Sequence, residues 1–354
     1  MKLFGKKKSE GDYEDDPSYA KASKGKGKGA KKGNPRKRKE APKPWGKKER
    51  LLILLLLILT AGGSGLLALS AREWKLPGLP RLKLEMPSIP FLTSEKVVLE
   101  GNNQKNTEKA SEVISAFTEK TKGLSGVYGL YIVDLNSGFS FGINEHETFQ
   151  AASFIKLPVM AAVFMEEENG GLSLGDKYTL KDSDKASGAG SLYYKPAGYE
   201  ITYKNLVRLM GKESDNTAFR IVRNLLGDEK VNDVIIKLGM KDTFLEENET
   251  TPEDIGEFFN DLWLGNIVNE DNKEELLDNL TDTDYEAWIT AGIPDRIRFA
   301  HKYGREVHVV NDAGIVYSNK PFVIVTMSKG VVEREADEVI PTLSKMIYDK
   351  WTTN

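Results

Sequence analysis

The stretch "AASFIKLPVM", residues 151–160, places a serine three residues ahead of a lysine at the start of an apolar segment that predicts a helix. One helical turn separates Ser153 from Lys156, so their side chains emerge on the same face, with Cβ atoms roughly 5–6 Å apart. A lysine there can accept the serine's hydroxyl proton if burial or a second cation lowers its pKa. An ordinary amphipathic turn has the same spacing, which recurs twice in the first 26 residues. The rest of the chain has to distinguish the two interpretations.

The 354 residues carry a formal net charge of −3 that hides an uneven distribution. Residues 1–50 hold 18 Lys and Arg against 7 Asp and Glu, a net of +11, and the remainder holds 32 against 46, a net of −14. The absence of cysteine excludes disulfides, thiolate metal sites, a cysteine nucleophile and a lipoprotein anchor. Three histidines (His146, His301 and His308) are too few for a multi-histidine metal centre, and we expect no metal and no cofactor.

Residues 51–71, "LLILLLLILTAGGSGLLALSA", contain no charged side chain. As a helix they would span about 31 Å, enough for a hydrocarbon core of about 30 Å, so they predict a transmembrane helix. Basic residues are denser before this segment than after it, which predicts a single-pass protein of the cell membrane with a cytoplasmic N-terminus and an extracytoplasmic remainder. A cleavable signal peptide is the alternative, because residues 68–70 resemble a cleavage site, but the 50-residue basic region is much longer than usual.

The segments around this helix have distinct compositions. Residues 1–50, rich in Lys, Gly, Ser and Pro, predict a disordered cytoplasmic tail whose partner is anionic lipid, with nucleic acid as the alternative. Residues 72–95 contain four prolines and predict a stiff linker. Residues 96–354 predict one globular domain.

Hydrophobic periodicity in that domain predicts strands at both ends around a helical middle, which indicates an α+β fold with an antiparallel sheet. The expected helices cover 107–123, much of 155–290, and a final segment with Ile340, Leu343, Ile347 and Trp351 on one face. The expected strands cover two runs within 126–144, then 305–317 and 321–329.

Two further motifs support a catalytic interpretation of the serine and lysine. "KESDNTAF" contains Ser214-Asp215-Asn216, the only such triplet in the chain, and "FAHKYGREVHVV" puts Lys302-Tyr303-Gly304 at the entrance to a strand. Neither motif alone indicates a catalytic site. Together with the serine–lysine pair, in this order along the chain and each in a suitable structural context, they form a specific signature of a serine active site. Strand alternation turns His301 to the opposite face from Lys302, where we expect it to be part of the packing.

With these motifs, residues 107–350 resemble the penicillin-recognising serine hydrolases, most closely the class A β-lactamases. The resemblance implies a β-lactamase/transpeptidase-like fold, with a five-stranded antiparallel sheet flanked by helices, an all-helical subdomain, and an active site between them. It implies an acyl-serine intermediate formed with β-lactams or D-Ala-D-Ala-type cell-wall peptides. By position, Ser153 would be the nucleophile, Lys156 its general base, and Ser214 the hydroxyl that passes a proton to the leaving nitrogen.

The resemblance also implies a substrate-binding set made of Asn216, Lys302, Gly304 and Arg305. Lys302 would attract a substrate carboxylate and depress the Lys156 pKa, Asp215 would brace its loop, and the N–H groups of Ser153 and Arg305 would form the oxyanion hole. The third motif departs from the family pattern, because Tyr303 replaces a small hydroxyl residue. Either Lys302 and Arg305 together hold the carboxylate, or the preferred ligand differs.

A second departure concerns release of the acyl group. Class A β-lactamases carry a water-activating glutamate on a long loop, whereas "KDTFLEENETTPEDI" passes into a helix start at Thr251-Pro252 within a few residues. We interpret Glu246, Glu247 and Glu249 as a solvated acidic turn and expect slow deacylation. The alternatives are a non-catalytic protein that binds or scaffolds cell-wall peptide on the same fold, or a hydrolase of an unrelated ester or amide.

Overall fold

The computed structural model describes residues 53, 55–57, 60, 99–100 and 104–353. The predicted tail (1–50) and linker (72–95) lie outside these residues, as does most of the predicted transmembrane segment (51–71). Among the described residues, no helix combines the length and apolar character needed to cross a membrane.

An antiparallel sheet forms the centre of the domain, with strand order β1-β3-β2-β10-β9-β8. Five of these strands form the five-stranded antiparallel sheet that the family resemblance implied, and the two-residue β1 extends it beside β3. Its strands are β1 (Leu99–Glu100), β2 (Val127–Asp134), β3 (Ser140–Ile143), β8 (Phe299–Glu306), β9 (Val309–Val316) and β10 (Phe322–Lys329). Strand β8 therefore lies at the edge of the described sheet, and no further strand pairs with its outer side.

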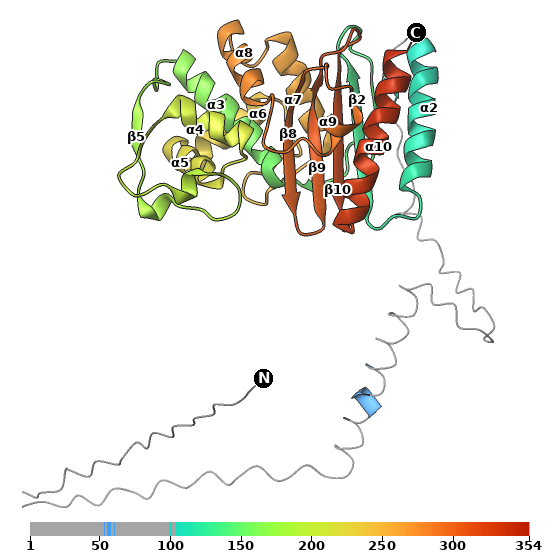
Figure 1. Ribbon diagram of the computed structural model, residues 1–354, viewed down its shortest axis with the longest axis horizontal. Coiled ribbons are helices and arrows are strands. Elements are labelled where there is room, and N and C mark those ends of the chain that lie inside the picture. The colour runs from blue at the N-terminus through green and yellow to red at the C-terminus, as the bar shows by residue number, and fades with distance from the viewer. Residues whose placement is uncertain (1–52, 54, 58–59, 61–98, 101–103, 354) are drawn as a thin grey trace, which may run out of the picture. The chain divides into compact units, whose positions relative to one another are not determined.

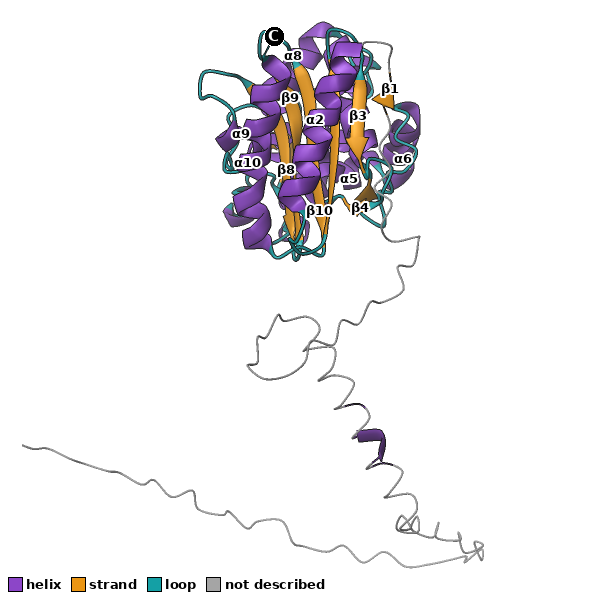
Figure 2. Cartoon of the chain, turned by 90° about the vertical axis from the view of Figure 1, so that its right-hand side faces the viewer, coloured by secondary structure: helices purple, strands orange, loops and turns teal. Residues whose placement is uncertain are grey.

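Each face of the sheet packs against a different group of helices, because successive side chains on a strand point to opposite faces. In β10, Phe322 and Ile324 contribute to one hydrophobic core, and Val323 and Val325 contribute to the other. The first core is closed by α2 (Gln104–Thr121), α9 (Ile289–Gly292) and α10 (Glu333–Thr352). Figures 1 and 2 show α2 and α10 side by side on this face.

Both predicted terminal helices are confirmed. The apolar stripe of α10 is buried, and Trp351 packs against Phe141 at 5.3 Å between ring centroids. The two predicted runs within 126–144 form β2 and β3, and the turn between them contains Gly138 at a φ of 70°, which favours glycine.

The opposite face carries α7 and the helical part of the domain (Figure 1). Its α-helices are α3 (Lys156–Glu168), α4 (Tyr203–Lys212), α5 (Asn216–Leu226), α6 (Asp228–Lys237), α7 (Pro252–Leu264) and α8 (Glu270–Asn279). Its 3-10 helices are η1 (Ala152–Ile155), η2 (Asp182–Asp184) and η3 (Leu192–Tyr194). Two small antiparallel pairs complete it, β4 (Phe149–Gln150) with β7 (Glu249–Thr250) and β5 (Lys177–Thr179) with β6 (Glu200–Thr202).

One predicted strand boundary is wrong. The run 305–317 is not a single strand, because β8 ends at Glu306 and β9 begins at Val309. His308 has a φ of 61°, so the chain reverses there without glycine or an Asn-Gly pair. The third motif consequently lies inside β8 rather than at the entrance to a strand.

Candidate active site

Ser153 and Lys156 come together where a 3-10 turn leads into α3. Ser153 lies in η1 and Lys156 is the first residue of α3, so the α-helix itself begins three residues later than the serine. Residues i and i+3 eclipse one another in a 3-10 turn. Lys156 Nζ accordingly lies 2.8 Å from Ser153 Oγ, within hydrogen-bonding distance.

Burial changes the chemistry of this lysine. The Lys156 side chain is only 3 % exposed, and removal from water disfavours its charged form. Burial lowers the Lys156 pKa to about 8, although the charges of Asp215 and Glu306 act in the opposite direction. About a tenth of the amine is therefore neutral at pH 7, and the neutral form is the one that can act as a general base.

The second motif supplies two more contacts to the same amine. Lys156 Nζ lies 2.8 Å from Asn216 Oδ1 and 3.3 Å from Ser214 Oγ. The Asn216 amide nitrogen donates to the carbonyl of Ser187, another residue that lines the cleft, at 3.0 Å. A hydroxyl, a second hydroxyl and an amide thus surround one buried nitrogen.

Asp215 stabilises the loop that carries Ser214, as the sequence predicted. It is fully buried and caps α5 by accepting a hydrogen bond from the backbone N–H of Ala218 at 2.8 Å. Its other oxygen accepts from the N–H of Leu192, also at 2.8 Å. Ser214 before it has a φ of 54°, a conformation that costs a non-glycine residue free energy and is over-represented at functional sites.

The 3-10 turn η1, which carries Ser153, also lies against β8. Ala152 adopts a φ of 49°, and this strained residue was not identified from the sequence. A Cβ placed on Gly304 would lie 3.0 Å from the Ser153 nitrogen and 3.1 Å from the Ala152 Cβ. A side chain at this position would press on the Ser153 amide, so glycine favours this close approach of the β8 backbone. The arrangement can present backbone N–H groups to an oxyanion.

The two cations expected to hold a carboxylate are already engaged. Lys302 has no exposed surface, and its Nζ donates to the Tyr303 carbonyl at 2.8 Å. Burial, followed by the charge of Lys156, places the Lys302 pKa well below its usual value. The Arg305 guanidinium forms two hydrogen bonds with Asp337 of α10, at 2.9 and 3.1 Å. Burial rather than Lys302 is the leading cause of the low Lys156 pKa.

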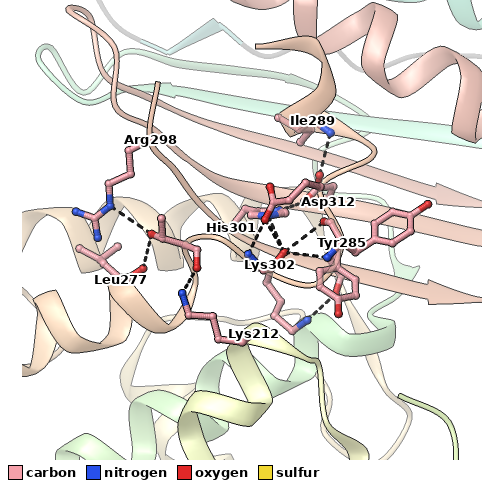
Figure 3. Close-up of polar contacts among 12 residues, drawn as sticks. Lys212, Leu277, Tyr285, Ile289, Arg298, His301, Lys302 and Asp312 are labelled. Atoms are coloured by element: carbon pink, nitrogen blue, oxygen red, sulfur yellow. Dashed lines mark hydrogen bonds and ion pairs between the residues drawn. The ribbon is translucent and has the colours of Figure 1, made fainter. Parts of the chain in front are cut away.

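His301 belongs to a buried network on the other face of β8. Its Nδ1 lies 2.7 Å from Asp312 Oδ1 and its Nε2 lies 3.2 Å from Glu286 Oε1 (Figure 3). Asp312 also accepts from the backbone N–H of Ile289, which ties β9 to the start of α9. Burial acts to lower the His301 pKa, but the two carboxylates outweigh it and raise this pKa to about 9. The prediction that His301 serves the packing is confirmed.

A cleft of about 610 Å³ opens in front of Ser153 and Lys156. Its walls include several charged residues that sequence reasoning did not assign to the site: Arg220, Arg223, Asp228, Glu246 and Glu306. Two arginines stand against three carboxylates, which leaves these five residues a formal net charge of −1, and no sequence motif marks them. Within the described ranges, no group of three or more histidine, aspartate or glutamate side chains is arranged to hold a metal ion.

The predicted acidic turn that contains Glu246, Glu247 and Glu249 leads into the predicted helix, but one of its glutamates borders the cleft. Thr251 caps α7 by accepting from the N–H of Asp254, and Pro252 occupies the first turn, which confirms the predicted helix start. Residues 238–251 alone connect α6 to α7, so no long loop intervenes. Glu246 is exposed but borders the cleft next to the buried Leu245.

Comparison with known proteins decides the family. The model of the "Beta-lactamase enzyme family" matches residues 109–351, more than half of the chain. The chain belongs to the beta-lactamase enzyme family. Within the beta-lactamase family, an imipenem-hydrolyzing beta-lactamase of Enterobacter cloacae is 25 % identical over 274 residues, covering 70 % of this chain and 91 % of that protein.

Solved structures of beta-lactamase relatives share the fold. A beta-lactamase from Sphaerobacter thermophilus is 29 % identical, with a TM-score of 0.62 over 67 % of this chain and 95 % of that one. A point mutant of PBP-A, solved as an acyl-enzyme complex with penicillin G, is 27 % identical, with a TM-score of 0.63 over 69 % of this chain and 96 % of that one. The protein is therefore a serine hydrolase with a β-lactamase/transpeptidase-like α+β fold.

Proposed function

We propose that this protein is a membrane-anchored extracytoplasmic serine hydrolase that forms an acyl-serine intermediate at Ser153 and releases it slowly. Its acyl donors are β-lactams or cell-wall peptides of the D-Ala-D-Ala type. The single observation that carries the proposal is the 2.8 Å contact between Ser153 Oγ and the buried Lys156 Nζ.

In acylation, neutral Lys156 takes the Ser153 proton while Oγ bonds to the substrate carbonyl carbon. The N–H groups of Ser153 and Arg305 stabilise the oxyanion, and Asn216 orients the substrate's amide. When the carbon–nitrogen bond breaks, the proton passes from Lys156 to Ser214, whose Oγ lies 3.3 Å from Lys156 Nζ, and from Ser214 to the leaving nitrogen. The leaving amine departs neutral, and Ser153 carries the acyl group.

Deacylation needs a base that activates water, and the geometry supports a slow step. In the described part of the chain, the hydrogen-bond partners of Lys156 are two hydroxyls and an amide, with no carboxylate among them. Three carboxylates border the cleft, those of Asp228, Glu246 and Glu306, and all three residues are solvent-exposed. A general base typically contributes 10²–10⁴-fold, so hydrolysis of the acyl-enzyme without one is slow by about that factor.

Intact-mass spectrometry of the full chain with excess penicillin G tests the proposal. The expected result is an adduct of penicillin mass that persists on the wild type and is absent from Ser153→Ala. Rapid loss of free penicillin without an adduct would show fast turnover and contradict slow deacylation. Neither adduct nor loss of penicillin would remove penicillin acylation and favour a non-catalytic binding protein.

The location is proposed from the sequence. Residues 51–71 anchor the chain, the basic tail lies against anionic lipid in the cytoplasm, and the hydrolase domain is exported. Protease treatment of intact cells should degrade the domain while leaving the tail intact. Retention of an intact domain after this treatment, with degradation only after lysis, would contradict the orientation.

A further inference from the structure

The cleft in front of Ser153 lies on the acyl side of the carbonyl that is attacked. In the proposed acylation the leaving nitrogen faces Ser214, which is buried, as is Lys302. Asn216, which orients the donor's amide, lines the cleft together with Ser153. The part of the donor that stays on the enzyme therefore occupies this space, and the charges on its walls act on the acyl group.

Glu306 reaches this space from β8. Side chains two residues apart on a strand point to the same face, so Glu306 shares the face of Gly304. A Cβ on Gly304 would lie 3.0 Å from the Ser153 nitrogen, so this face meets the turn that carries the nucleophile. Glu306 lines the cleft and is solvent-exposed. Its carboxylate therefore borders the space that an acyl group on Ser153 would fill.

The Glu306 carboxylate is held in position without being neutralised. Its Oε1 accepts a hydrogen bond from Asn248 Nδ2 at 3.2 Å. Asn248 is itself fixed against the turn before the nucleophile, because its carbonyl accepts from the Ala151 N–H at 2.7 Å. A neutral amide is thus the partner of this carboxylate, and among the described residues no lysine, arginine or histidine forms an ion pair with it.

The other charges on the cleft walls are largely matched. Arg223 and Asp228 compensate one another through two hydrogen bonds at 2.6 and 2.8 Å. Arg220 comes from α5 and donates to a backbone carbonyl at 2.9 Å. Apart from the general base, this leaves one cation, Arg220, against the two carboxylates of Glu246 and Glu306. Of these three, Glu306 is the one on the strand that contacts the nucleophile turn.

A carboxylate without a cationic partner attracts positive groups and repels negative ones. We propose that Glu306 is a specificity-determining residue that selects acyl donors whose acyl portion carries an ammonium group. Such donors are β-lactams or cell-wall peptides with a free amine on the acyl side of the attacked carbonyl. This inference rests on the proposed acylation of Ser153 and places no restriction on the leaving group.

Three penicillins that differ at the end of the acyl side chain test this selection on the full chain. Their δ-aminovaleryl, valeryl and glutaryl side chains are cationic, neutral and anionic near neutral pH, and all three keep the same β-lactam ring and carboxylate. Second-order rate constants for acylation are measured by intact mass. The aminovaleryl compound should exceed the valeryl compound about threefold to fivefold, as expected for an exposed ion pair, and the glutaryl compound about tenfold.

Glu306→Gln keeps the shape of the side chain and an acceptor for Asn248 but removes the charge. The ratio of the aminovaleryl to the glutaryl rate constant should fall at least about threefold, and added salt should lower the wild-type ratio in the same direction. A change in the Lys156 pKa affects all three compounds equally and cancels in this ratio. Glu247→Gln is the matched control, because Glu247 is exposed but does not line the cleft, and it should keep the ratio within about twofold.

The outcomes separate the selection from the proposed function. Equal rate constants for the cationic and anionic compounds, or a ratio that Glu306→Gln leaves unchanged, would show that the selection is wrong while acylation at Ser153 stands. An equal fall of the ratio in Glu247→Gln would assign the preference to the net charge of the surface and overturn the role of Glu306. If none of the three compounds acylates Ser153, the proposed function fails and the selection fails with it.

Discussion

Burial of Lys156 should make the acylation of Ser153 depend on pH in a way that the structure specifies. A pKa of about 8 leaves the amine about 9 % neutral at pH 7, about 50 % at pH 8 and about 91 % at pH 9. Only the neutral amine can accept the Ser153 proton, so the acylation rate constant should rise about tenfold between pH 7 and pH 9. An exposed lysine with an ordinary pKa would still be about 97 % protonated at pH 9.

The assay follows formation of the acyl-enzyme by intact mass at a fixed β-lactam concentration from pH 6 to pH 10. Lys156→Ala should reduce the rate by on the order of 10²–10⁴ and abolish the inflection near pH 8. Lys230→Ala is the matched control, because that lysine pairs with Glu166 at 2.6 Å and does not line the cleft. A wild-type rate that is constant between pH 7 and pH 9, or that titrates above pH 10, would refute the reasoning from burial.

Three further predictions concern the surroundings of this base. Glu306→Gln removes a charge that raises the Lys156 pKa, so the midpoint of the rate profile should move below pH 8 by on the order of a few tenths of a unit; an upward shift contradicts this. Gly304→Val places a side chain against the Ser153 amide and should slow acylation by about 10²–10³. Gly175→Ala, whose Cβ would meet nothing closer than 3.7 Å, should keep the wild-type rate, and equal rates for both variants would rule out the oxyanion geometry. His301, with a pKa raised from 6.5 to about 9, contributes stability that is complete below pH 6.5 and is lost as pH rises through about 9, at most about 3 kcal/mol. Urea unfolding at pH 6 and pH 9.5 should show a larger fall for the wild type than for His301→Gln, and equal falls would exclude this contribution.

Periodicity alone predicted most of the elements that build the domain. The stripe of Ile340, Leu343 and Ile347 is buried in α10, because an amphipathic pattern must place its apolar face against something. The hairpin at His308 was missed because the turn has neither glycine nor proline and lies within a run of β-branched residues. The φ of 61° there is imposed by pairing of β8 with β9, which no local preference of the sequence indicates.

In the candidate site too, some contacts could be predicted from the sequence and others could not. The spacing of Ser153 and Lys156 was sufficient to predict that they meet, since residues three apart share one side of a turn. The contacts of Lys156 with Ser214 and Asn216 join residues 58 and 60 positions apart, and only the motif set suggested them. The orientation of Lys302 towards Tyr303 could not be predicted, because a motif specifies a residue's position but not the partners available to its ammonium.

By itself, the sequence determined most of the helices and strands and the pairing of a serine with a lysine across one turn. These follow from interactions between residues a few positions apart, which periodicity and spacing record directly. Tertiary structure alone decided that burial lowers the Lys156 pKa to about 8 and that Lys302 and Arg305 are already engaged. Burial and electrostatic interactions are sums over neighbours drawn from the whole chain, so they exist only once distant segments have packed together.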